Sequence, residues 1–227
     1  IGAFGPGMFT AEGRLAADQP GLTNWLTWLS VNSQRRGMLV TQDEIVLRER
    51  FMNEQMVYYA GFYDEWAELS QALDQNGEIV VGVAPLPQGP FGQSRPLLRA
   101  EMMYFNPTSS ETQYETALAL ARFLVNPEQN RRLMRETRRV PANQLVRIDT
   151  AVYPQIAGFA AQARTAVNIP APFRPHILSP LTASLYTSVL SGVRTPTQAV
   201  CDYQATLIAT MQGQQPDLTP CQPSDSP

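Results

Sequence analysis

Apolar and polar positions follow two different periods along this chain, and these periods predict helices and strands in turn. Residues 21–36, GLTNWLTWLSVNSQRR, repeat apolar side chains every three or four positions, which predicts an amphipathic helix. A second helical pattern covers 41–54 and leads into 55–60, QMVYYA, where β-forming residues predict a short buried strand. The helical period returns over 62–75 and stops at an Asn-Gly pair.

The middle of the chain favours extended structure. The apolar run over 79–84 predicts a core strand that two prolines end. Residues 88–94, QGPFGQS, predict a hairpin-like connection, and 96–106, PLLRAEMMYFN, predict a further extended segment.

Helices separated by prolines are expected in the remainder of the chain. A serine precedes the predicted helix within 109–125, and Asn126 caps the next helix, which has a proline at its first position. Further helical patterns cover 153–167, 180–191 and 195–212, the last with Thr195 as its cap and a proline in its first turn. The alternation of strands and helices predicts a helix-rich α/β protein of one large or two small domains.

The composition argues against several classes of function. The chain of 227 residues carries a net charge of −3 and has a pI near 5.2, which argues against a nucleic-acid or anionic-membrane partner. No run of 18 apolar residues occurs, so no transmembrane helix is expected. All 17 basic residues are arginines, which excludes Schiff-base chemistry on lysine.

No motif for catalysis, cofactor binding or metal binding occurs, so we expect neither an enzyme nor a cofactor nor a metal site. The one histidine, His176, lies between prolines, which predicts a loop with a structural or solvent-facing imidazole; a ligand contact is the alternative. The arginine-rich stretch 131–139 predicts an ion-paired helix face rather than an anion site, because Glu128 and Glu136 lie one turn on either side of Arg132.

The two cysteines, Cys201 and Cys221, have no metal-ligand spacing. Cys201 falls in a predicted helix, and Cys221 falls in a tail rich in Pro, Gln and Ser that cannot pack by itself. We expect a disulfide that tethers the tail, with two unrelated thiols as the alternative. Such a disulfide indicates a location outside the cytoplasm.

Aromatic residues are concentrated in QMVYYAGFYDEW, residues 55–66. The rings belong to Tyr58, Tyr59, Phe62, Tyr63 and Trp66, and they surround a single glycine. The acidic residues of this segment lie at a predicted helix start, where they favour the helix dipole. Phe62 and Trp66 share a face at helical spacing, so a place in the core is the alternative to a site.

The order of these segments resembles the extracellular solute-binding proteins that serve ABC sugar importers, the maltose and oligosaccharide-binding type. The resemblance rests on FMNEQMVYYAGFYDEW, on GVAPLP, on the helices from Ala117 to Gln129, on VPAN, and on SG followed by TPTQAV. It covers residues 21–213 and corresponds to the second half of that family.

This resemblance implies the class II periplasmic-binding-protein fold, in which ligand binds between two α/β lobes that close on it. Residues 1–213 would form one lobe plus segments that cross to the other, and 214–227 would form the tail. Because the family's first lobe is missing from this sequence, exposed strand edges could drive dimerisation. The opening IGAFGPGMF contains no targeting signal, so we expect a signal that was removed or was never part of this chain, and an extracellular or periplasmic, membrane-anchored protein.

The resemblance also implies non-covalent binding of a carbohydrate for import through permease subunits. Rings stack on sugar faces in such sites, and nearby polar groups bind the hydroxyls. The expected ligand-binding residues are Tyr59, Phe62, Tyr63, Asp64, Arg99, Glu101 and His176. Where the family has a pair of glycines, this chain has Arg99 and Ala100, followed by Glu101. The charges of Arg99 and Glu101 indicate a charged ligand or a site that no longer binds sugar. The alternative function is an extracellular sensor or interaction domain without transport.

Overall fold

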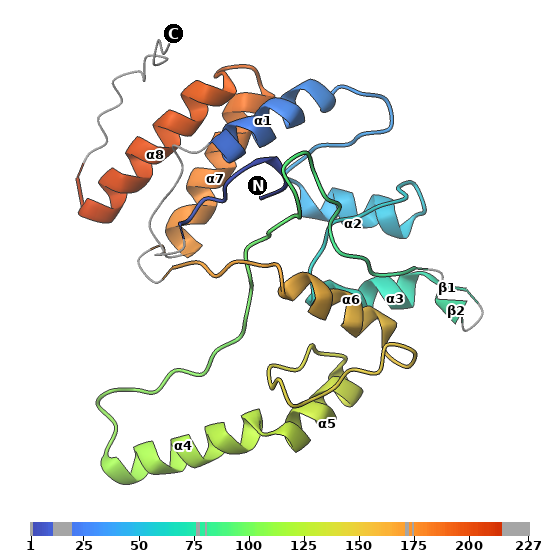
Figure 1. The fold of residues 1–227 in the computed structure, drawn as a ribbon, viewed down its shortest axis with the longest axis vertical. Helices are drawn as coiled ribbons and strands as arrows, with labels where there is room; N and C mark the ends of the chain where they lie inside the picture. Colours follow the sequence, from blue (N-terminus) through green and yellow to red (C-terminus); the bar gives the residue numbers. More distant parts are fainter. Residues whose placement is uncertain are drawn as a thin grey trace. The chain divides into compact units, whose positions relative to one another are not determined.

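The computed structural model of the protein describes residues 2–10, 20–75, 78–79, 81–170, 173 and 175–214. The chain forms two compact units (Figure 1). The first comprises residues 1–44, 87–98 and 165–227, and the second comprises 45–86 and 99–164. Each unit is therefore assembled from segments that are far apart in the sequence.

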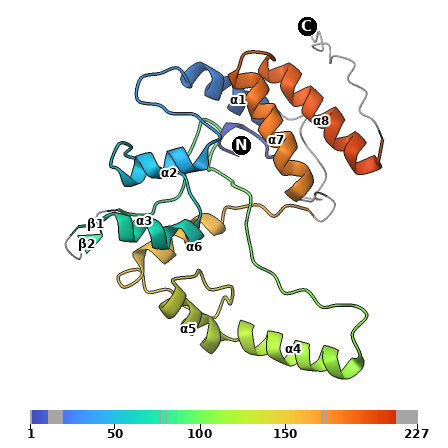
Figure 2. The same cartoon turned by 180° about the vertical axis from the view of Figure 1, so that it is seen from behind.

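Three helices form the core of the first unit: α1 (Pro20–Asn32), α7 (Pro175–Leu190) and α8 (Pro196–Gln212). They lie side by side in both views (Figures 1 and 2), and a short 3-10 helix, η1 (Gly2–Phe4), contacts α1. Two leucines at their centre, Leu26 and Leu207, are completely buried. The remaining buried members of this core are Leu22, Phe173, Leu178, Leu185, Val189, Ala199, Val200 and Tyr203.

An aromatic group packs beside this core. Trp25 and Trp28 of α1 stack with ring centroids 5.4 Å apart, and the Phe4 ring contacts both. The indole N–H of Trp25 donates a hydrogen bond of 2.6 Å to the hydroxyl of Tyr186. Burial raises the pKa of Tyr186, so its phenol stays protonated at neutral pH.

The second unit contains α2 (Glu44–Met52), η2 (Tyr63–Glu65), α3 (Trp66–Ala72), α4 (Glu111–Val125), α5 (Pro127–Thr137) and α6 (Pro154–Ala163). Two short strands, β1 (Asp74–Gln75) and β2 (Glu78–Ile79), pair antiparallel, with Asp74 opposite Ile79. Met134, Val146 and Ile156 form a small buried cluster in this unit.

The helix caps predicted from the sequence are confirmed. The Ser110 hydroxyl accepts a hydrogen bond from the backbone N–H of residue 113 at the start of α4, and Asn126 does the same for α5. Thr195 caps α8, with Pro196 at its first position. Gly213 ends α8 in the left-handed conformation, with φ of 67°, which a glycine adopts without steric cost.

The predicted strands are right only in part. The hairpin at 88–94 is confirmed, because the Gly89 and Gly92 backbones hydrogen-bond each other. Within the described residues, however, 55–60 and 81–84 belong to no strand, and 96–106 contributes only the parallel bridge from Leu97 to Val167. A strand requires a hydrogen-bonded neighbour, and an apolar pattern does not specify that neighbour. The predicted burial of 55–60 is also wrong at Val57, which is 83% exposed.

The predicted loop around His176 is wrong. This residue lies in the first turn of α7, which begins at Pro175 and continues through Pro180. The prolines predict a break here, but a proline at the first helical position is compatible with a helix, because the first N–H groups have no intrahelical partner.

The buried side chain of Asn130 connects the start of α5 to the VPAN segment. Its amide nitrogen donates to the carbonyls of Leu124 and Asn126 at 3.1 and 3.2 Å, and its oxygen accepts from the backbone N–H groups of Ala142 and Asn143 at 3.0 and 3.3 Å. One side chain therefore satisfies four backbone groups.

We expect Asn130→Ala to lower the stability of this part of the chain by about 1–3 kcal/mol, because the hydrogen bonds of a buried side chain to four backbone groups are lost. Hydrogen exchange resolved by residue should show faster exchange at Ala142 and Asn143 than in the parent protein. Arg131→Ala, at the exposed neighbouring position, is the matched control and should leave both amides protected. Equal protection in the two variants would contradict the role of Asn130.

Candidate functional site

One carboxylate, that of Glu65, organises the aromatic segment. The Tyr59 hydroxyl donates to Oε1 of Glu65 at 2.7 Å, and the backbone N–H of Phe62 donates to Oε2 at 2.6 Å. Arg48 of α2 approaches the same carboxylate at 3.8 Å. The Tyr59 ring also stacks on Phe51, with centroids 5.5 Å apart. Tyr59 is therefore held at both its ring and its hydroxyl.

Gly61 permits this arrangement because it has no side chain. A Cβ atom at this position would overlap the Tyr59 ring and would lie 2.7 Å from Oε2 of Glu65. The single glycine among the rings is thus explained by the close approach of Tyr59 and Glu65 to the backbone.

Aromatic and charged side chains from this segment and from two other parts of the chain form a second group, which we call the corner cluster. Its members are Phe62, Tyr63, Asp64, Arg99, Glu101 and Arg139. They come from three separate parts of the second unit: the connection that leads into α3, the extended segment before α4, and the chain just after α5.

Arg99 connects the first two of these parts. Its Nη1 lies 3.2 Å from Oδ2 of Asp64, and its guanidinium lies over the Phe62 ring, 5.4 Å from the centroid. The side chains of Arg99 and Asp64 are 64% and 44% exposed, so this ion pair contributes no more than about 1 kcal/mol to stability.

Glu101 connects the second and third parts. The Tyr63 hydroxyl donates to Oε1 of Glu101 at 3.3 Å, and Arg139 forms an ion pair with Oε2. Burial raises the pKa of Tyr63; the negative charges of Glu101 and Asp64 add to this effect, and the positive charge of Arg139 opposes it. The Tyr63 phenol is therefore protonated at neutral pH and acts as a hydrogen-bond donor.

The structure brings together five of the seven side chains expected at the ligand: Phe62, Tyr63, Asp64, Arg99 and Glu101. Tyr59 instead contacts Phe51 and Glu65 beside them. His176 is exposed at the start of α7 and belongs to the other unit. A ligand role for each of these residues stays a prediction.

Arg139 is the member of the corner cluster that sequence reasoning missed. The ion-paired face predicted for this stretch is confirmed at Arg132, whose Nε donates to Glu136 at 2.8 Å. Arg139, however, follows Arg138, which ends α5 in the left-handed conformation with φ of 57°. No local pattern points to its partner Glu101, because the two residues are 38 positions apart.

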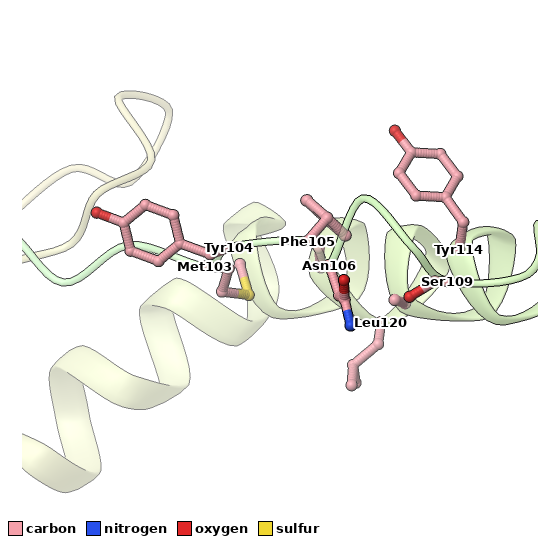
Figure 3. Close-up of a pocket in the computed structure, with 9 residues that line it drawn as sticks. Met103, Tyr104, Phe105, Asn106, Ser109, Tyr114 and Leu120 are labelled. Atoms are coloured by element: carbon pink, nitrogen blue, oxygen red, sulfur yellow. The ribbon is translucent and has the colours of Figure 1, made fainter. Parts of the chain in front are cut away.

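A shallow pocket of about 210 Å³ lies elsewhere in the second unit, between the extended segment at 103–106 and α4 (Figure 3). The rings of Tyr104 and Tyr114 lie at its two ends, and Phe105 packs against Tyr114 with centroids 5.5 Å apart. The pocket shares no residue with the corner cluster.

The described residues contain no helix that is both long enough and apolar enough to cross a membrane. They also contain no group of three or more His, Cys, Asp or Glu side chains that could bind a metal ion.

Comparison with solved structures identifies the fold. The maltose-maltodextrin binding protein of Alicyclobacillus acidocaldarius matches with a TM-score of 0.73 and 20% identity, over 91% of this chain and 57% of its own. The maltose-binding periplasmic protein of Listeria monocytogenes, solved with maltose, matches with a TM-score of 0.70 and 19% identity, over 94% and 56%. A cyclo/maltodextrin-binding protein solved with maltotetraose matches with a TM-score of 0.72 and 20% identity, over 92% and 55%.

These matches confirm the periplasmic-binding-protein fold that the resemblance implied. The chain spans between 55% and 57% of the length of these three structures. No curated protein sequence matches it. A family profile described as bacterial extracellular solute-binding protein matches residues 3–159, which is more than half of the chain. The chain therefore belongs to the bacterial extracellular solute-binding proteins.

Proposed function

We propose that this chain is part of the substrate-binding component of an ABC importer and that it binds a carbohydrate through the corner cluster. Solute-binding proteins are carriers, so the chain is not an enzyme, and the family acts on the extracellular or periplasmic side of the membrane. The proteins of similar fold are described as binding maltose or maltodextrin, which supports a sugar as the ligand. Permease subunits as partners, and an anchor in the membrane, belong to the same proposal.

The chemistry of the corner cluster is the observation that carries this proposal. Sugars present apolar ring faces and hydroxyl groups that both donate and accept hydrogen bonds. Phe62 is 48% exposed as a residue, and its ring offers an apolar surface beside the Arg99–Asp64 pair. The guanidinium donates and the carboxylate accepts, so together they match a pair of neighbouring hydroxyls. Tyr63 adds a ring and a protonated hydroxyl.

Calorimetric titration of the complete gene product with maltotriose, cellotriose and mannotriose tests this function. We expect saturable binding of at least one of the three sugars, with one ligand per protein. Free amino acids and a dipeptide serve as the comparison ligands. Binding of the comparison ligands without binding of any oligosaccharide would contradict a carbohydrate receptor.

Dimerisation of this chain also stays a proposal. Apolar side chains on extended segments of the second unit are strongly exposed, among them Tyr58 at 86% and Met102 at 68%. Extended segments of this kind can pair with a second copy through backbone hydrogen bonds.

The predicted disulfide belongs to this extracellular setting. Cys201 is partly buried on α8, and Cys221 lies outside the described residues. We expect the denatured, unreduced protein to contain no reactive thiol and the reduced protein to contain two, as measured by thiol titration. Closing a loop of this size should add about 3 kcal/mol to stability. Two reactive thiols before reduction would show that the bond is absent.

A further inference from the structure

The charges of the corner cluster cancel in pairs. Arg99 lies against Asp64 and Arg139 lies against Glu101, so two positive and two negative side chains form two ion pairs. All four belong to the second unit, and they are contributed by three separate segments of the chain.

Tyr63 connects the two pairs. Its hydroxyl donates to Glu101, and Asp64 follows it directly in the sequence. Arg99 lies 3.2 Å from Asp64 and Arg139 pairs with Glu101, so both ion pairs lie beside Tyr63. Burial raises the pKa of the Tyr63 phenol, and the charges of Glu101, Arg139 and Asp64 also act on it.

These two ion pairs contribute little to the stability of the fold. The four side chains are between 44% and 67% exposed, and ion pairs that are this accessible contribute weakly to stability. What the pairs do change is the electrostatic potential at the corner. With both carboxylates ionised the site has no net charge; without one carboxylate it would carry an unpaired guanidinium, which binds carboxylates through two parallel hydrogen bonds.

We propose that Asp64 and Glu101 are specificity-determining residues, which neutralise Arg99 and Arg139 and make the site select uncharged sugars over sugars that carry carboxylates. This inference rests on the proposed function, because it requires a carbohydrate at the corner cluster. It also explains how a chain with arginine and glutamate at 99 and 101 accommodates a neutral ligand there.

The test compares each neutral trisaccharide with a derivative in which its primary hydroxyls are oxidised to carboxylates. Maltotriose, cellotriose and mannotriose and their three derivatives are titrated into the complete gene product and into its Glu101→Gln variant. We expect the parent protein to bind the neutral trisaccharide at least about tenfold more tightly than its carboxylated derivative. In Glu101→Gln this preference should shrink by about tenfold or more, because Arg139 is released to bind a ligand carboxylate.

Glu136→Gln is the matched control. It makes the same chemical change in an exposed ion pair of the same unit, with Arg132, and that pair lies outside the corner cluster. The preference for neutral sugar should be the same in this variant as in the parent protein. Thermal melts of both variants should match the parent, since each replaced side chain is more than half exposed.

The outcomes separate the two proposals. If the parent protein binds no sugar of either form, the proposed function fails and the inference fails with it. If the parent binds neutral sugar but Glu101→Gln keeps the full preference, or if Glu136→Gln loses it equally, the inference alone is overturned. A parent protein that prefers the carboxylated sugars overturns it as well.

Discussion

Leu207→Ala is expected to destabilise the first unit by about 2–5 kcal/mol, because it removes a leucine from the centre of a packed core. Leu207 lies on α8, is completely buried, and belongs to the core that α8 forms with its neighbouring helices. The neighbouring core side chains cannot fill the resulting cavity unless a helix moves.

The measurement must report on the first unit alone, because a protein of two units need not unfold in one step. The chain has three tryptophans, and Trp25 and Trp28 both lie on α1. In a Trp66→Phe background, tryptophan emission during denaturation with urea therefore follows the first unit. Ile208→Ala is the control, since Ile208 is the next residue on the same helix and is 47% exposed. A larger loss for Ile208→Ala than for Leu207→Ala would show that the core is assigned wrongly.

The double substitution of Tyr63 and Asp64 by alanine is expected to abolish sugar binding by the complete gene product. It removes a ring face and a carboxylate acceptor together, and it leaves a ligand hydroxyl without a partner. The loss should exceed about a hundredfold in affinity, which corresponds to about 2.7 kcal/mol of binding free energy. Calorimetric titration with the neutral trisaccharides measures this loss.

Tyr104 and Glu115 provide a matched control, because they are an exposed tyrosine and an exposed glutamate of the same unit. Their double substitution by alanine should leave sugar binding unchanged. Thermal melts should show little change for either double variant. If the Tyr63/Asp64 variant melts far below the parent and still binds sugar, these two residues support the fold and not the site.

Local signals explain what the sequence predicted well. Ser110, Asn126 and Thr195 were recognisable as caps because a helix start depends on residues three or four positions apart. The aromatic segment was recognised for the same reason, since most of its residues are adjacent in the sequence. The helices begin and end within a few residues of the predicted limits, except that α7 begins at Pro175 and not at the predicted residue 180. A proline at the first helical position does not break a helix.

Contacts between distant segments explain what the sequence did not predict. The strands expected at 55–60 and 79–84 depend on partners that an apolar pattern does not identify, and among the described residues of these ranges only Ile79 lies in a strand. The ion pair between Glu101 and Arg139 likewise joins an extended segment to the end of α5. In the sequence, each residue of such a pair is indistinguishable from other charged surface residues. The two residues become neighbours only in the folded chain.

The hydrogen bonds of Glu65 have a consequence for redesign of this receptor. The Glu65 carboxylate accepts hydrogen bonds from the Tyr59 hydroxyl and the Phe62 backbone N–H, and it lies near Arg48. These contacts do not involve the ring of Phe62 or the side chains of Tyr63 and Asp64. The residues that hold the backbone of the corner thus differ from the residues that we propose contact the ligand. We expect a library that varies positions 62–64 and keeps Glu65 and Gly61 to change ligand preference while the protein continues to fold.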